Sequence, residues 1–140
     1  FNNMKPTIIK QKIGLGIGWR VLHHSFFSLE PDNQYATLEV AKYFTENLFR
    51  ATNGTFTIDM GFYGTYHQNR AGTYAIYLIR GDFDSGEILA KVKTRSQADA
   101  VAQLESFTQA ANQGEYANGI EKLLNQMRDL SIAQKLFNLF

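Results

Sequence analysis

Three histidines are the residues of this chain best suited to bind a metal: His23, His24 and His67. Imidazole nitrogens are common zinc ligands, but a site needs several of them converging on one point. His23 and His24 are adjacent in a segment that we expect to be extended, so their rings point to opposite faces of a strand. His67 is distant in sequence, near the end of a predicted hairpin. We therefore predict no metal centre.

Acidic residues form the second group with chemical potential. The stretch Asp82-Phe83-Asp84-Ser85-Gly86-Glu87 has part of a calcium-loop pattern. Its glycine comes one position too early, however, and Lys93 stands where an EF-hand loop has its closing carboxylate. A hairpin turn explains the stretch better. Asp59 with Asp82 or Asp84 could act as a hydrolytic carboxylate pair if both faced one cleft.

Nucleophilic catalysis lacks the usual residues. The chain has no cysteine and no G-x-S-x-G sequence. We predict no catalytic residues and no cofactor, and favour a chain that is not an enzyme. A small enzyme or a ligand-binding cup between the sheet and its long helix stays open, and its lining would be Phe44, Phe62, Tyr74 and Trp19.

Glycines at alternate positions, Gly14, Gly16 and Gly18, raise the question of a phosphate-binding loop. Such loops join a strand to a helix N-terminus, whereas here Trp19-Arg20-Val21-Leu22 continues an alternation of apolar and polar residues. We predict one long strand over Ile9–Leu29, bent or bulged at the glycines, with a stripe free of side chains on its outer face. The stripe either permits curvature or receives a partner.

The remaining periodicities define the elements around these residues. They predict, in order, a helix over Tyr35–Ala51, strands over Thr55–His67, Thr73–Arg80 and Glu87–Lys93, a helix over Gln97–Asn112 that Ser96 caps, and a C-terminal helical segment over 115–140. The order β-α-β-β-β-α-α predicts an α+β fold with a curved antiparallel sheet of about four strands and helices on one face. We expect one domain over 1–140, with residues 1–6 flexible.

Composition restricts the partners. The 140 residues carry a net charge of +1, so no global basic field attracts nucleic acid. No apolar run is long enough to span a bilayer, and we predict no membrane partner. The absence of cysteine fits a reducing compartment, and we predict a cytoplasmic location.

The outer face of the predicted sheet combines aromatic and basic residues. Strand alternation places Tyr63, Tyr77, Lys91 and Lys93 there, and Arg20 joins them if the first strand belongs to the sheet. Together with Trp19, these are candidate partner-binding residues. Such a surface could stack bases and contact phosphates, or bind protein.

The order helix, three strands, helix over Tyr35–Asn112 resembles that of double-stranded-RNA-binding domains, which implies RNA as a partner. The sequence Thr94-Arg95-Ser96-Gln97-Ala98-Asp99 lacks that family's lysine cluster, however. Nucleic-acid binding is therefore the alternative and not the preferred function.

The C-terminus ends on large apolar residues, which a chain terminus seldom exposes unless it docks somewhere. Leu136, Phe137 and Phe140 are the candidate docking residues. The preferred function is a non-catalytic interaction or assembly module, which forms homo-oligomers or binds a protein through the outer sheet face and this apolar segment.

Overall fold

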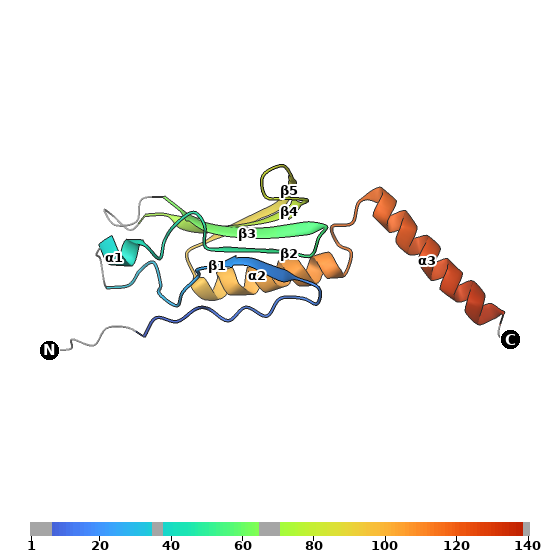
Figure 1. Cartoon of the computed structure of the whole chain (residues 1–140), viewed down its shortest axis with the longest axis horizontal. Helices are drawn as coiled ribbons and strands as arrows, with labels where there is room; N and C mark the ends of the chain where they lie inside the picture. The colour runs from blue at the N-terminus through green and yellow to red at the C-terminus, as the bar shows by residue number, and fades with distance from the viewer. Residues whose placement is uncertain (1–6, 35–37, 65–70, 139–140) are drawn as a thin grey trace.

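The computed structural model describes residues 7–34, 38–64 and 71–138, without the side chains of Leu38, Ala133, Lys135 and Leu136. Its elements are β1 (Arg20–His24), α1 (Leu38–Ala41), β2 (Phe49–Thr52), β3 (Phe56–Tyr63), β4 (Thr73–Arg80), β5 (Glu87–Thr94), α2 (Gln97–Asn112) and α3 (Gly119–Phe137). The strands form one antiparallel sheet in the order β1-β2-β3-β4-β5. Helix α2 covers one face of this sheet (Figure 1). The α+β class is confirmed, with one strand more than expected.

The core lies between the sheet and α2. Alternate residues of β3 and β4 point toward the helix, and they pair across the strands as Ile58 with Leu78 and Phe62 with Tyr74. Leu104, at the middle of α2, is fully buried against them. Each such side chain contributes on the order of 1.5 to 3 kcal/mol to folding. The three-stranded meander and α2 are confirmed, and their ends agree within a residue except at β3, which ends at Tyr63 where the predicted strand continued to His67. Residues 65–67 of that prediction lie outside the described residues.

Aromatic rings fill the space that a ligand-binding cup would need. Phe44 packs edge-to-face on Phe62 with ring centroids 5.1 Å apart, and Phe62 packs on Tyr74 at 5.3 Å. All three residues are buried. The cup interpretation therefore finds no support in these rings.

The predicted helix over Tyr35–Ala51 is wrong. Within the described part of this range, residues 38–51, α-helix is limited to the four residues of α1, and the predicted helix runs into β2. Phe49 and Ala51 face the core while Arg50 and Thr52 face outward, which is the two-residue period of a strand. Pairing with β3 decides the outcome. Between α1 and α2 the described residues form four strands, and not the three strands of the order that resembled an RNA-binding domain.

The N-terminal segment is also different from the predicted single long strand. Regular strand is confined to β1, and Gly18 reverses the chain with a φ of +86°. An antiparallel bridge joins Lys10 to Phe27. Residues 8–17 therefore run back past α2 as an extended strap.

Gly14 and Gly16 of the glycine stripe face α2 and not the outer side of the sheet, which corrects the prediction for these two residues. The Gly14 N–H donates to Glu105 Oε2 at 2.6 Å, and the Gly16 N–H donates to Thr108 Oγ1 at 2.9 Å. A Cβ on Gly16 would lie 2.5 Å from Asn112 Nδ2. The glycines thus allow the strap backbone to approach the helix closely.

Helix α3 stands away from the rest of the molecule (Figure 1). Its first turn has a reciprocal cap: the Glu121 N–H donates to Asn118 Oδ1, and the Asn118 N–H donates to Glu121 Oε1. Arg80 of β4 donates to Glu121 Oε2 at 2.9 Å and to the Tyr116 carbonyl at 2.6 Å. In the part of the chain described, neither α3 nor any other helix has the length and apolar character needed to cross a bilayer.

Candidate association surfaces

The outer face of the sheet carries a buried ion pair. Asp59 on β3 is only 1% exposed, and its Oδ1 accepts a hydrogen bond from Arg50 Nε on β2 at 2.9 Å. The Phe83 ring, in the turn between β4 and β5, covers the Arg50 guanidinium with its centroid 3.7 Å from Cζ. The turn therefore folds back over the sheet and holds the cation between a carboxylate and an aromatic ring.

A surface pocket of about 320 Å³ lies under this turn. Asp59 and Asp84 both line it, so the structure brings together one of the carboxylate pairs proposed from the sequence. Burial raises the pKa of Asp59 above its ordinary value, and the hydrogen bond and charge of Arg50 oppose that shift. Arg50 donates to one oxygen of Asp59, so this carboxylate already takes part in an ion pair that joins β2 to β3.

Two predicted aromatic residues and one predicted lysine meet on this face. The rings of Tyr63 and Tyr77 are edge-to-face with centroids 6.5 Å apart, and Lys91 Nζ lies 5.2 Å over the Tyr77 ring. Burial is the main cause that raises the pKa of Tyr63, and the nearby Asp59 carboxylate adds to it. Lys93 pairs with Ala75 on the same face and is exposed.

Trp19 and Arg20 do not join this cluster. The Trp19 indole N–H donates to Asn112 Oδ1 on α2 at 3.1 Å, so its ring is directed to the helix side. Arg20 is exposed on β1, at the opposite end of the strand order from β5. The structure therefore divides the predicted aromatic and basic surface into two separate parts.

The two described histidines have separate local partners. His23 Nε2 lies 3.0 Å from the Asn47 carbonyl oxygen, and His24 Nε2 lies 2.8 Å from that of Gln11. Within residues 7–34, 38–64 and 71–138 no group of three potential metal ligands occurs. His67 lies outside the described residues.

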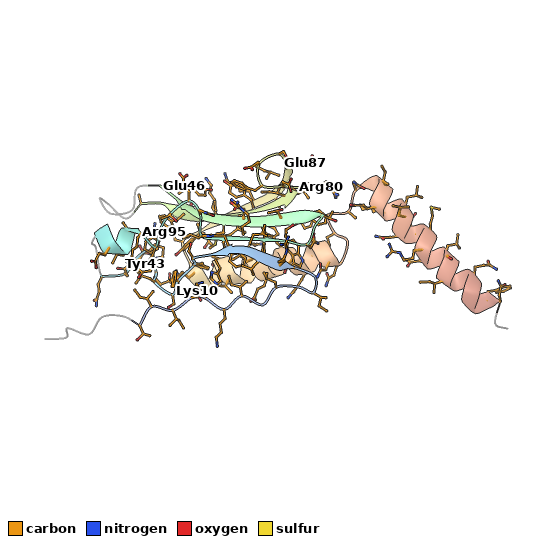
Figure 2. The ribbon with its side chains drawn as sticks, viewed as in Figure 1. Lys10, Tyr43, Glu46, Arg80, Glu87 and Arg95 are labelled. Carbon is orange, nitrogen blue, oxygen red and sulfur yellow. The ribbon has the colours of Figure 1, made fainter. Side chains whose placement is uncertain are left out.

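The most exposed apolar surface belongs to α3. The side chains drawn on this helix project away from the rest of the molecule (Figure 2). Six of them form a stripe, which we call the α3 stripe: Ile120 (71% exposed), Leu123 (55%), Leu124 (54%), Met127 (57%), Leu130 (69%) and Phe137 (75%). In an amphipathic helix of a globular protein, most apolar side chains pack against a core. In the described part of the molecule, the side chains of the α3 stripe do not pack against one.

The α3 stripe follows the alternating three- and four-residue spacing of a coiled coil. Ile120 and Met127 occupy a positions of a heptad, and Leu123, Leu130 and Phe137 occupy d positions, with Gln134 as the third a residue. Met127, Leu130, Ser131 and Gln134 enclose a surface hollow of about 430 Å³. A hollow formed by four residues of one helix is what receives a side chain from a facing helix.

The sequence already contained this signal, because the spacing from Ile120 to Phe137 can be counted without coordinates. Reasoning from the sequence instead emphasised the last residues of the chain. Phe137 is exposed within α3, so it does not dock on the described core. The Leu136 side chain and Phe140 lie outside what the structure describes.

The chain has no significant match among protein-family models, curated proteins or solved structures.

Proposed function

We propose that this protein is an assembly module in which α3 pairs with α3 of a second copy. The observation that carries the proposal is the α3 stripe, whose six apolar side chains are more than half exposed and follow heptad spacing. A heptad repeat is the pattern by which one helix fits against another of the same repeat.

The stability of α3 itself supports a partner. A helix of 19 residues without tertiary packing is marginal in water, because most helical stability in proteins comes from burial of an apolar face. The Asn118–Glu121 cap adds only about 1 kcal/mol. Pairing with a second helix would supply the missing burial.

The charges of α3 favour a second copy as that partner. Glu121, Lys122, Arg128 and Asp129 occupy b and c positions, away from the stripe. The e and g positions carry no charge, so two copies can approach without like-charge repulsion. Ile132 is the one exposed large apolar residue of the described helix that lies off the stripe.

The expected affinity is moderate. Each side chain of the stripe would contribute on the order of 1 kcal/mol, because only part of its surface is available for burial. Association itself costs about 4 to 15 kcal/mol. Six side chains from each copy would together supply about 12 kcal/mol. With a cost near the lower end of that range, about 8 kcal/mol remains, which corresponds to dissociation in the micromolar range.

Arginine pairing makes nucleic acid the less favoured partner. Arg50, Arg80 and Arg95 are each bound to a carboxylate: Asp59, Glu121 and Asp32 respectively. A guanidinium that already has an anionic partner loses that partner when it binds phosphate. These three arginines are therefore less available to phosphate, and Lys91 and Lys93 are predicted basic residues of the sheet that have no carboxylate partner among the described residues.

Sedimentation velocity over about 1 to 200 μM tests the proposal. The unmodified chain is expected to pass from monomer to dimer over this range, with a parallel increase in helical circular dichroism. The double variant Leu123→Glu/Leu130→Glu places charges in the stripe and is expected to stay monomeric. Addition of salt should leave the dimer intact, because apolar burial is not screened.

Ile132→Glu is the matched control, since it adds the same charge to the same helix on the opposite side. It is expected to dimerise like the unmodified chain. A chain that is monomeric throughout the concentration range contradicts the proposal. Equal loss of dimer in the control and the stripe variant would contradict it as well. Complex formation with nucleic acid that disappears at moderate salt would favour the alternative.

A further inference from the structure

Strand β5 is the last strand of the sheet and has one free edge. In the described residues its only strand partner is β4, and no strand follows it in the sheet order. Every second residue of an antiparallel edge strand directs its N–H and C=O away from the sheet. These groups can pair with an added strand.

A groove runs beside this edge. Val92, Lys93 and Thr94 of β5 form one wall. The other wall comes from α2: Asp99, Ala102, Gln103 and Ser106. The groove encloses about 460 Å³. A strand paired with β5 would direct alternate side chains into it, because side chains of a strand point to opposite faces in turn.

The other face of the edge is basic. Lys91 and Lys93 are both exposed and point to the outer face of the sheet, since they pair with Tyr77 and Ala75. Neither lysine has a carboxylate partner among the described residues. Their spacing of two residues matches acidic side chains at alternate positions of an added strand, about 6.6 Å apart.

A second copy of β5 would fit this edge poorly. An antiparallel pair of β5 strands centred on Lys91 and Lys93 would bring lysines of the two copies together on one face. Like charges opposite each other destabilise a strand pair, and lysines on an edge strand oppose self-pairing. The charge therefore selects against this chain itself and favours an acidic partner.

We propose that β5 binds an extended peptide segment whose acidic residues alternate with small or β-branched residues. The peptide adds a sixth strand to the sheet. Its acidic side chains lie beside Lys91 and Lys93, and its small side chains, on the other face, enter the groove between β5 and α2, which is lined by both polar and apolar residues. This inference is independent of pairing through α3, because it uses a different element and a different partner.

Titration with synthetic peptides, followed by backbone amide NMR shifts and by calorimetry, tests the proposal. The probe is an acetylated and amidated Glu-Val-Glu-Val-Glu-Val peptide. It is expected to bind and to shift amides of β5 and α2, and its affinity should decrease as salt is added. The same peptide with N-methyl groups on alternate amides keeps its charge but cannot complete the strand pairing, and it should not bind.

The second test reverses the charge of the two lysines on the protein and measures binding of the same peptide. Lys91→Glu/Lys93→Glu is expected to weaken binding by about tenfold or more, because attraction becomes repulsion at two positions. The matched control is Lys10→Glu/Lys12→Glu, two exposed lysines with the same spacing in the strap. Lys10 lies on the opposite side of the molecule from Glu87, where β5 begins (Figure 2). This control should bind like the unmodified chain.

Three results would overturn the proposal. Absence of binding by the unmodified chain removes it outright. Equal binding of the N-methylated peptide would show attraction between charges without an added strand. Concentration-dependent shifts of β5 amides in the peptide-free chain would show that a second copy occupies the edge. Amide spectra of each variant establish that it is folded.

Discussion

Arg50 supplies the counter-charge for Asp59, a buried carboxylate on the outer side of the sheet. A carboxylate that is 1% exposed must either be neutral or have a close cation, because burial of an unpaired charge is costly. Arg50 supplies the cation at 2.9 Å. The raised pKa of Asp59 shows that desolvation outweighs the help from Arg50.

Removal of Arg50 should therefore destabilise the protein in a pH-dependent way. Arg50→Ala leaves a buried, unpaired carboxylate and is expected to cost about 3 kcal/mol of unfolding free energy at neutral pH. Because the folded pKa of Asp59 lies above its unfolded value of 3.8, neutral Asp59 favours folding, and that contribution is lost as pH rises through the folded pKa. Urea unfolding at neutral pH and near pH 4 measures the loss, which should be smaller at the lower pH.

Arg50→Ala/Asp59→Asn is the control for this explanation. Without a charge at position 59 the cost of removing Arg50 should no longer depend on pH through this site. A cost that is equal at both pH values in the single variant would contradict the assigned role of Asp59.

A substitution at Gly61 tests a second feature of a single residue, its close contact with the backbone of Glu46. A Cβ at this position would overlap the backbone carbonyl of Glu46, which is held because the Phe62 N–H bonds to the Thr45 carbonyl at 2.7 Å. Gly61→Ala is expected to cost about 3 kcal/mol, since a backbone group cannot yield as a flexible side chain can. Thermal or urea unfolding measures it.

Gly119→Ala is the matched substitution in open space, at the first residue of α3. Alanine favours helix over glycine by about 1 kcal/mol, so this variant should be neutral or slightly stabilising. Equal effects of the two substitutions would show that the contact with Glu46 is not tight.

At the scale of elements, the meander and α2 were predictable because local pattern and tertiary contacts agree. The alternation in β3 and β4 continues over eight residues, and Ser96 begins α2 as an N-cap should. The prediction of helix for Phe49–Thr52 was wrong because Leu38, Phe44 and Leu48, which precede this strand, have helical spacing. Four residues are too few for periodicity to show that change, and pairing with β3 decides it.

The position of the strap against α2 could not be predicted, because it also depends on contacts between residues far apart in the sequence. Alternation indicates extended backbone, and residues 8–17 are extended, but it does not say which element lies beside them. The face of Gly14 and Gly16 depends on Glu105 and Thr108, about 90 residues later in the chain. The candidate residues on the outer face were predictable in part: Tyr63 and Tyr77 do meet, whereas Trp19 faces α2.

Glu121 connects α3 to the sheet, which makes the start of the helix sensitive to pH. Its hydrogen bond with Arg80, followed by the Asn118 N–H, lowers the pKa of the Glu121 carboxyl. A depressed pKa contributes stability above the unfolded value, and that contribution is lost as pH falls through the folded pKa. Both partners are partly exposed, so the effect should be modest.

Glu121→Ala should speed hydrogen exchange of the first-turn amides of α3 severalfold at neutral pH, because it removes a cap and an ion pair. The difference from the unmodified chain should shrink in acid, where Glu121 is protonated in both states. Lys122→Ala, one residue further along the helix, is the control and should change little. Identical exchange in the Glu121→Ala variant and the unmodified chain would show that the cap contributes nothing.

The whole molecule separates a packed α+β body from a projecting helix, and the two parts differ in how they are stabilised. The body buries both β3 and β4 against α2, while α3 contacts it through the Arg80 bonds near its start. An amphipathic helix attached in this way is well placed to reach a neighbour without disturbing the body. Association through α3 should consequently leave the unfolding of the body nearly unchanged.

Crosslinking through introduced cysteines tests that association most directly, because these 140 residues contain no cysteine. Ser131→Cys lies beside Leu130 on the α3 stripe, and Ile132→Cys lies off it. With a bis-maleimide that spans about 10 Å, the usual separation of packed helix axes, Ser131→Cys should give covalent dimers at micromolar concentration and Ile132→Cys few. Equal crosslinking of the two variants, or none for Ser131→Cys, would contradict pairing through the stripe.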